Sequence, residues 1–336
     1  MKKHSVIIDC DTGTDDAVAI IAALGSEELD IRAITTVCGN VDLAYTAANT
    51  LNLVRMLGFD TPVARGAERP LLRDITQLRA SDKEAPGGFG THGQTGMGNV
   101  RLLESSDSFY EKNAVETIYE QAVQCKGELE IIALGPQTNL ALALNVYPEL
   151  KRMIKCIYFM GGAVEGGNSS AVAEFNIFFD PEAAKIVFGS GIPLVMVGLD
   201  VTRKIVLTPD ILEYMCCVNP QMGERIRNIT RFYFDFHWKQ EGIIGCVIND
   251  PLAVAYFIDR TLCSGMEACT RIATEGLCIG QSVVDRFDFW KGHKNSYILT
   301  RTSPLSFMQM FFDRVLGVPE KTSLPMLEQI MKGDVL

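Results

Sequence analysis

The stretch that decides the fold lies at residues 5–16 and reads SVIIDCDTGTDD. Its first part is a short apolar run rich in β-branched residues, which is typical of a buried strand. A longer, alanine-rich apolar run at residues 17–24 follows and predicts a helix. The turn between strand and helix is crowded with four carboxylates: Asp9, Asp11, Asp15 and Asp16.

These four acids predict a metal site. Carboxylates this close together repel one another unless a cation offsets their charge, and oxygen ligands suit Ca²⁺ or Mg²⁺. In open α/β sheets, ligands bind in the crevice beyond the carboxyl ends of the strands. Asp15 and Asp16 alone could cap a helix, because its N-terminus attracts negative charge. Asp9 and Asp11 end a buried strand, where unpaired charge is costly, so we expect a metal-dependent active site.

Composition excludes several classes of protein. The 336 residues are 47% hydrophobic, enough for a large core, and the net charge of −10 argues against a nucleic-acid partner. No run approaches the ~18 consecutive apolar residues of a membrane span. Residues 1–4 lead directly into the first strand, which leaves no room for a signal peptide. The ten cysteines are scattered without a C-x-x-C pair, which favours reduced thiols and a cytoplasmic location; Cys216 and Cys217 could be redox-active or could simply fill space.

Strand-like and helix-like runs alternate along the chain. This alternation predicts an α/β fold with a mostly parallel, right-handed doubly wound sheet. Strands are expected at about residues 5–9, 31–37, 62–64, 129–134, 155–160 and 193–198. Helices are expected at about residues 16–24, 42–58, 112–125, 137–145, 181–189, 208–217, 221–238, 250–258 and 303–315.

We expect one domain over residues 1–336. Between residues 265 and 300 the pattern changes to short polar–apolar alternations, which predicts a small antiparallel addition. Residues 79–99 are rich in glycine and contain His92, and we interpret them as a mobile lid, although composition alone favours a plain surface loop equally.

Polar residues follow several predicted strands. Asn40 follows the second strand, the turn at 135–139 follows the fourth, and a glycine-rich loop at 161–168 follows the fifth. Asp250 stands directly before a proline, as at a helix start. If these strand ends share one edge of the sheet, Asp250 and Asn176 reach the first acid cluster.

Taken together, these segments resemble the nucleoside hydrolases of the inosine–uridine-preferring family. The opening D-x-D-x-G-x-D-D at residues 9–16 is the signature of that family. Further matching motifs occur in family order: TTVCGN at 35–40, HGxxG from His92, MGG at 160–162, AEFN at 173–176, DPEAA at 180–184 and NDP at 249–251. The resemblance runs from about residue 6 to residue 259 and is weaker in the last helix.

The resemblance implies a Rossmann-like fold of about eight strands with a tightly bound Ca²⁺. The ion would lie between the carboxylates of Asp11, Asp16 and Asp250 and the main-chain carbonyl of Leu134. Asp11 would also be the general base for the nucleophilic water, and Asp9 would lie behind these ligands and steady them. The reaction would be hydrolysis of the N-glycosidic bond of a ribonucleoside to ribose and free base, by a homodimer or homotetramer serving nucleoside catabolism.

The resemblance also implies how the sugar would bind. N-glycoside hydrolysis passes through a sugar with oxocarbenium character, so carboxylates and the attacking water lie on the face opposite the base. Glu174 and Asn176 could instead cap a helix, and Met160 could be a core residue. The side chains expected to hold the ribose hydroxyls or to lie against the sugar and water are Asp15, Asn40, Met160, Asn168, Glu174 and Asn176.

The sequence departs from the family pattern at Asn249. Many pyrimidine-preferring members carry a His there that helps to protonate the leaving base, whereas an amide can bind the base but cannot supply a proton. Our hypothesis is that His237, or His92 from the lid, supplies the proton. Tyr233 or Trp238 would then stack on the base. Alternatively, residues 232–238 form an aromatic core stripe.

Two other functions remain open from the residues alone. Residues 9–14 also resemble the first motif of haloacid-dehalogenase-type Mg²⁺-dependent phosphatases. Those enzymes need a later G-D-x-x-x-D pair, which is absent after the midpoint, and they give the doublet Asp15–Asp16 no part. A calcium- or sugar-binding module without turnover is the second alternative, although the EF-hand pattern fails for want of its terminal Glu.

Overall fold

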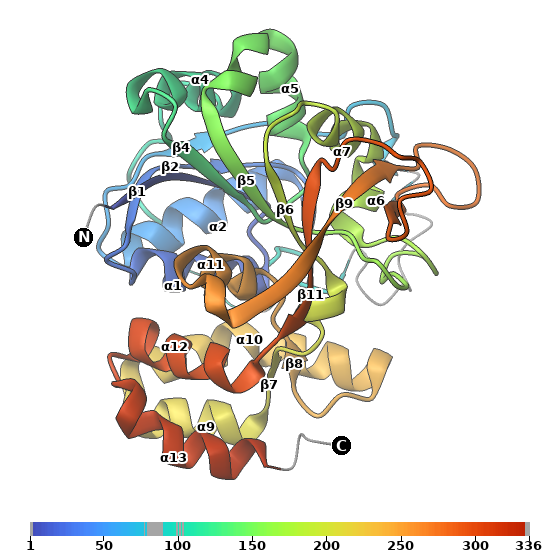
Figure 1. The fold of residues 1–336 in the computed structure, drawn as a ribbon. Helices are drawn as coiled ribbons and strands as arrows, with labels where there is room; N and C mark the ends of the chain where they lie inside the picture. The colour runs from blue at the N-terminus through green and yellow to red at the C-terminus, as the bar shows by residue number, and fades with distance from the viewer. Residues whose placement is uncertain are drawn as a thin grey trace.

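The computed structural model describes residues 3–76, 78, 90–98, 100, 102 and 104–332, and a nine-stranded sheet runs through its centre (Figure 1). The strand order is β10-β9-β11-β6-β5-β4-β1-β2-β3. Seven strands, from β11 to β3 in this order, are parallel to their neighbours, and β9 is antiparallel to both β11 and β10. The strands are β1 (His4–Cys10), β2 (Leu29–Thr36), β3 (Val63–Arg65), β4 (Leu129–Ala133), β5 (Ile154–Met160), β6 (Leu194–Val197), β9 (Cys263–Ile272), β10 (Ser282–Asp285) and β11 (Ser296–Thr302).

This sheet confirms the predicted α/β class and all six predicted strands. It has one strand more than the expected eight or so, because β9, β10 and β11 join it edge to edge. The antiparallel residues predicted near the C-terminus therefore extend the main sheet. A separate pair, β7 (Val206–Leu207) and β8 (Cys246–Val247), had no counterpart among the predicted strands.

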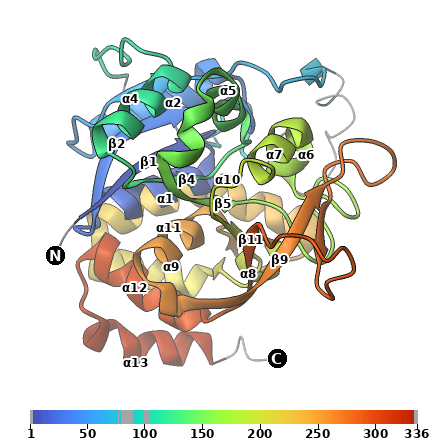
Figure 2. The same ribbon diagram turned by 45° about the horizontal axis from the view of Figure 1, so that its top comes forward.

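Helices cover both faces of the sheet (Figures 1 and 2). Helices α4 and α5 lie on one face, while α1 and α11 lie on the other, with α9, α12 and α13 beyond them. The helices are α1 (Thr14–Leu24), α2 (Leu43–Met56), α4 (Ala114–Cys125), α5 (Thr138–Val146), α6 (Phe175–Phe179), α7 (Pro181–Phe188), α8 (Leu199–Thr202), α9 (Pro209–Val218), α10 (Pro220–Glu241), α11 (Asp250–Ile258), α12 (Pro304–Leu316) and α13 (Glu320–Met331), with 3₁₀ turns η1 (Pro148–Arg152) and η2 (Arg260–Leu262).

The period-two alternation of a strand explains the two-sided core. Along β1, the side chains of Val6 and Ile8 pack into the apolar cluster on the α1 and α11 face. Ile7 packs into the cluster on the opposite face, with residues of α4, α5 and α7. Because both faces of β1 are covered, its central residues 6–8 are continuously apolar.

The chain reverses its direction of travel across the sheet at β1. Strands β2 and β3 follow on one side of β1, and β4, β5 and β6 follow on the other. β1 pairs in parallel with both β2 and β4. Such a reversal leaves a crevice at the carboxyl ends of the two central strands. Residues 9–16 lie at this crevice.

All nine predicted helices are present, and the described residues contain three further α-helices that were not predicted: α6, α8 and α13. Residues 79–89 and 99 of the expected lid lie outside the described residues, whereas residues 90–98 form turns. Within the described part of the chain, none of the helices combines the length and the apolar character needed to cross a membrane.

Candidate active site

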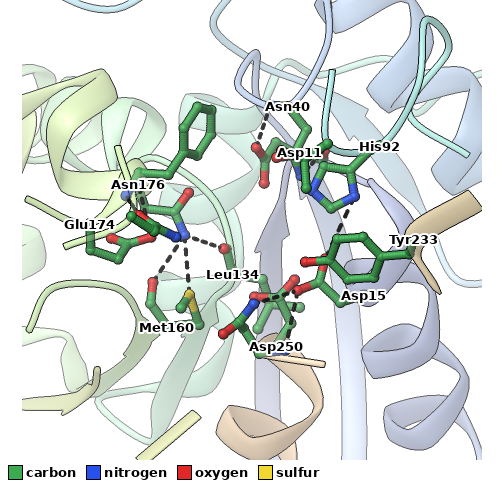
Figure 3. Close-up of a pocket in the computed structure, with 14 residues that line it drawn as sticks. Asp11, Asp15, Asn40, His92, Leu134, Met160, Glu174, Asn176, Tyr233 and Asp250 are labelled. Carbon is green, nitrogen blue, oxygen red and sulfur yellow. Dashed lines mark hydrogen bonds and ion pairs between the residues drawn. The ribbon is translucent and has the colours of Figure 1, made fainter. Parts of the chain in front are cut away.

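A pocket opens at the carboxyl ends of β1 and β4 (Figure 3). It holds about 360 Å³ of empty space, including the part open to solvent. Its lining residues come from the loops after β1, β2, β4 and β5, from the end of β5, from the 90–98 segment, from the first turn of α1, and from α6, α10 and the start of α11. They are Asp11, Asp15, Asn40, Thr91, His92, Leu134, Met160, Asn168, Glu174, Phe175, Asn176, Tyr233, Asn249 and Asp250.

Asp9 lies behind the pocket. Its Oδ1 accepts hydrogen bonds from the Thr35 hydroxyl at 2.5 Å and from the Asn139 amide at 2.7 Å. Its Oδ2 is buried without a hydrogen-bond partner among the described residues. Burial raises the pKa of this carboxyl to about 6, against the two hydrogen bonds that lower it. The expected role of Asp9, steadying its neighbours from behind, stays a prediction.

Asn40 connects Asp11 and Asp16. The main-chain N–H of Asn40 donates to Asp11 Oδ2 at 2.7 Å, and its side-chain amide donates to Asp16 Oδ2 at 3.1 Å. Glycines make this approach possible. A Cβ atom at Gly39 would lie 2.1 Å from Asp11 Oδ2, and one at Gly135 would lie 2.6 Å from Asp11 Oδ1.

Buried carboxylates form a cluster that could hold a metal ion. One carboxylate oxygen from each of Asp15, Asp16 and Asp250 lies within 4.8 Å of the other two, and all three residues are buried. Burial, and secondarily the other carboxylates, raises the pKa of Asp16 to about 7 and the pKa of Asp250 well above its ordinary range. The pKa of Asp11 is also raised well above its usual value by burial, followed by the charge of Asp16.

Such a cluster fits a hard divalent cation. Bare carboxylates at this depth are unfavourable unless protonated, and a cation removes the same penalty by supplying the missing positive charge. The donors are oxygen atoms, which Ca²⁺ and Mg²⁺ prefer. The cluster includes Asp15, where the expected ligand set has Asp11.

Leu134 contributes its main chain to the same pocket. Its carbonyl oxygen accepts a 2.7 Å hydrogen bond from the side-chain amide of Asn176. The same amide donates to the carbonyl of Met160 at 3.1 Å. Asn176 therefore joins the ends of β4 and β5 and fixes where the Leu134 carbonyl lies.

Glu174 is the N-cap of α6. Its Oε1 accepts from the N–H of Asn176 at 3.0 Å, and its Oε2 accepts from those of Gly162 and Ile177 at 2.9 and 3.3 Å. Capping and pocket lining are thus combined in one side chain. Burial raises the pKa of Glu174 to about 7 in spite of these three bonds, which lower it. Asn168 Oδ1 accepts from the N–H of Phe175 at 2.9 Å, which orients this side chain too.

The glycine-rich loop at 161–168 is held from outside the pocket. Asp200 accepts hydrogen bonds from the N–H groups of Val164 and Glu165 at 2.8 and 3.2 Å. The Ser282 hydroxyl bonds to both the N–H and the carbonyl of Ala163. These contacts keep the loop, and with it Asn168, at the rim.

An aromatic wall faces the polar side chains across the pocket. His92 and Tyr233 lie opposite Glu174 and Asn176 in Figure 3. The two rings of the wall are 5.0 Å apart. His92 Nδ1 accepts the N–H of Thr14 at 3.0 Å and lies 3.9 Å from Asp15 Oδ1. Burial lowers the pKa of His92.

His237 and Trp238 are not among the described residues that line the pocket. His237 is buried behind Tyr233, with ring centroids 4.3 Å apart and its Nδ1 bonded to the Tyr233 carbonyl at 3.0 Å. Trp238 is 60% exposed on α10. Of the two aromatic residues expected to stack on a base, Tyr233 lies at the pocket and Trp238 does not.

Asn249 lines the pocket beside Asp15. Both its main-chain N–H and its side-chain amide donate to Asp15 Oδ2, at 3.2 and 3.3 Å. Thr91 and Phe175 also line the pocket, although we did not predict them as site residues. Each is the neighbour of a predicted site residue, in the HGxxG and AEFN motifs, and this adjacency was the only available signal.

The pocket and its fold agree with comparisons against known proteins. A model of the family described as "Inosine-uridine preferring nucleoside hydrolase" matches residues 6–309. The chain belongs to this family, and the protein is accordingly a ribonucleoside hydrolase, that is, an N-ribohydrolase.

Individual relatives cover nearly the whole chain. The pyrimidine-specific ribonucleoside hydrolase RihA of Escherichia coli (strain SMS-3-5 / SECEC) is 35% identical over 92% of this chain and 97% of its own length. The enzyme of that name from Citrobacter koseri is 37% identical with the same coverage. Among solved structures, a purine-preferring ribonucleoside hydrolase from Gardnerella vaginalis has a TM-score of 0.84 and 32% identity, covering 93% of this chain and 98% of that one.

Proposed function

We propose that this pocket hydrolyses the N-glycosidic bond of ribonucleosides with Ca²⁺ as the resident ion. The observation that carries the proposal is the meeting of buried carboxylates with the Leu134 carbonyl at the reversal point of the sheet. Asp11, Asp16, Asp250 and this carbonyl would hold the ion. When bound, a divalent cation lowers the pKa of a water molecule and orients it.

Asp11 is the proposed general base. Its carboxyl lies in the pocket, and Asn40 holds Oδ2 by a 2.7 Å hydrogen bond, so the group is oriented before substrate arrives. A catalytic base works best when its pKa lies near the operating pH. Burial and the charge of Asp16 raise the pKa of Asp11 in the metal-free pocket, and a bound cation would lower it again, so that Asp11 could accept a proton as a carboxylate. Asp9 and Asn40 keep this part of the acid-rich turn in place.

Asp15, Asn168, Glu174 and Asn176 are the proposed ribose ligands, with Asn40 and Met160 beside the water and the sugar. The hydrogen bond between Asn168 Oδ1 and the N–H of Phe175 leaves the amide N–H groups of Asn168 for a hydroxyl. Carboxylates around the ring favour the positive charge that develops on the sugar as the bond to the base breaks.

The base would lie against His92 and Tyr233. Aromatic faces bind planar bases by stacking. The source of the leaving-group proton stays a hypothesis, with His237 and His92 as candidates. The accepting role of His92 Nδ1 toward Thr14 disfavours a doubly protonated ring, whereas His237 does not line the pocket and could reach a base only through Tyr233.

The names of the relatives include both a pyrimidine-specific and a purine-preferring enzyme. Our proposal therefore covers ribonucleosides as a class. Family membership disfavours the phosphatase and the binding module without turnover. A homodimer or homotetramer, and a cytoplasmic location, stay expectations from the sequence.

A nucleoside panel tests the proposal. Purified protein is incubated with purine and pyrimidine ribonucleosides, with and without a chelator, and released ribose is measured. We expect ribose release that stops on chelation and returns with Ca²⁺. Asp11→Asn should abolish turnover. The variant should still fold without Ca²⁺, with the circular dichroism spectrum of the wild-type protein. Turnover that survives complete chelation would overturn the proposed metal dependence.

A further inference from the structure

Asn249 makes an unusual pair of contacts with Asp15. Two donors of this one residue, the main-chain N–H and the side-chain amide, converge on the same oxygen, Asp15 Oδ2. A carboxylate can only accept hydrogen bonds, so the amide nitrogen must face Asp15 and the amide oxygen must point elsewhere. The orientation of the Asn249 amide is thereby settled by its partner.

The oxygen atom of the Asn249 amide is in a different situation from its nitrogen. Asn249 Oδ1 is buried and has no hydrogen-bond partner among the described residues. A buried acceptor without a partner is unfavourable, and native structures contain few of them. Fold stability therefore does not explain an amide at position 249. Its contribution is the bond to Asp15.

The contact with Asn249 also makes the two carboxylate oxygens of Asp15 different from each other. Oδ2 is occupied by Asn249, whereas Oδ1 lies 3.9 Å from His92 Nδ1, beyond hydrogen-bond distance. A carboxylate with one oxygen fixed from both the main chain and the side chain of a neighbour cannot rotate freely. Its second oxygen then meets a ligand in a fixed direction.

We propose that Asn249 is a positioning residue for sugar recognition, acting through Asp15, and that it does not read the base. The inference rests on the proposed function, in which Asp15 binds ribose hydroxyls. It differs from the expectation that Asn249 binds the base directly. Substrates that lack a ribose hydroxyl should therefore reveal the role of Asn249, and substrates that differ only in the base should not.

The test compares two ratios of kcat/KM in wild type, Asn249→Leu and Tyr233→Leu. The sugar ratio is that of a ribonucleoside to its 2′- or 3′-deoxy analogue with the same base. The base ratio is that of inosine to uridine. Each ratio is taken within one protein sample, so a loss of folded protein affects both substrates equally and cancels.

For Asn249→Leu we expect the sugar ratio to fall about tenfold, since a site built to bind a hydroxyl loses discrimination when its ligand is no longer oriented. The base ratio should stay within about twofold of wild type. Tyr233→Leu, on the aromatic wall, should show the reverse pattern. Asn249→Leu with a changed base ratio and an unchanged sugar ratio would overturn the inference.

Two further results distinguish a failure of this inference from a failure of the proposed function. A fall of tenfold or more in Ca²⁺ affinity for Asn249→Leu, measured by calorimetry without substrate, would mean that Asn249 serves the metal site, through Asp15 or through the adjacent Asp250, and would also overturn the inference. Wild-type protein that hydrolyses no ribonucleoside would contradict the proposed function itself, before any variant is compared.

Discussion

The side-chain amide of Asn176 donates a 2.7 Å hydrogen bond to the main-chain carbonyl of Leu134. This bond connects the proposed ribose side of the pocket with the proposed metal side. A carbonyl oxygen has two lone pairs, so it can accept from Asn176 and still face a cation. The proposed metal site and the proposed ribose site would therefore be coupled through one side chain.

Replacing Asn176 should weaken metal binding even though Asn176 is not a proposed metal ligand. In Asn176→Ala the Leu134 carbonyl loses the donor that fixes it, and we expect the Kd for Ca²⁺ to rise about tenfold, as is usual for partners that orient a ligand. Calorimetry on the metal-free protein measures this. Asn168→Ala is the control, because its bond goes to the N–H of Phe175, and its Kd should match wild type. Equal Kd values for all three proteins would contradict the prediction.

The proposed roles of Asp11 and Asp15 can be distinguished by substituting each residue in turn. The proposed roles place Asp11 on the metal and Asp15 on the sugar, whereas the carboxylate cluster includes Asp15. We expect Asp11→Asn to lower Ca²⁺ affinity at least about tenfold. Asp15→Asn should instead raise KM with little change in metal affinity. If Asp15→Asn loses the metal and Asp11→Asn keeps it, the two assignments must be exchanged.

The metal-free protein should lose stability as the pH rises. Burial raises the pKa of Glu174 from 4.5 to about 7, so folding favours its protonated form. This stabilisation is complete below the unfolded pKa of 4.5 and is lost as the pH rises through about 7. The rise in pKa corresponds to roughly 3 kcal/mol of unfolding free energy.

Glu174→Gln tests this sign, because a glutamine does not titrate. Denaturant unfolding of chelated protein should give a smaller decrease in unfolding free energy between about pH 5 and pH 8 for the variant than for wild type. The other buried carboxyls still titrate, so part of the decrease should remain. A decrease as steep as in wild type would mean that Glu174 titrates normally in the folded protein.

His237→Ala should discriminate between leaving groups. Nitrophenolate leaves without a proton, whereas a purine or pyrimidine needs one, so the variant should slow natural nucleosides far more than a nitrophenyl riboside. Steady-state kinetics on both substrates give the comparison, and His92→Ala is assayed in parallel. Equal losses on both substrates would exclude His237 as the proton source.

Asn139 should contribute strongly to the stability of the fold, because its side chain makes three hydrogen bonds. Its amide donates to Asp9 Oδ1 and to the Thr36 carbonyl at 2.7 and 3.0 Å, and its oxygen accepts the N–H of Ala67 at 2.8 Å. Asn139→Leu removes all three bonds, and we expect a loss of about 3 kcal/mol in unfolding free energy. Thr35→Val removes one bond to Asp9 and should cost about 1 kcal/mol, as chemical denaturation can measure.

The sequence predicted the elements whose pattern is local. The first strand and helix, and the other predicted strands and helices up to residue 258, show clear apolar periodicity, whereas the short elements α6, α8, β7 and β8 were missed. The pairing of β11 with β6, and of β9 with β11, joins distant segments, so periodicity could indicate strands there but not their place in the sheet. Helix α13 was missed, and Pro325 inside it is a residue that ordinarily argues against a helix.

In the site, too, features with a local sequence pattern could be predicted and contacts between distant residues could not. Resemblance to the family located most of the pocket, because its motifs follow the strands in order. Helix geometry could have improved the prediction for α10. Tyr233 and His237 are four residues apart and share a face, whereas Trp238 lies about 140° around the helix from Tyr233 and points to solvent. The contact of Asn249 with Asp15 joins residues 234 positions apart, and no local pattern contains it.

The raised pKa values of the buried carboxyls have a consequence for how the protein acquires its ion. Asp9 and Asp16 have pKa values of about 6 and about 7 in the metal-free pocket. At a pH near 7, the buried carboxyls of the metal-free pocket are therefore partly protonated, and an entering cation must displace these protons. Binding of a metal ion would therefore release protons to the solution, and a lower pH would weaken metal binding.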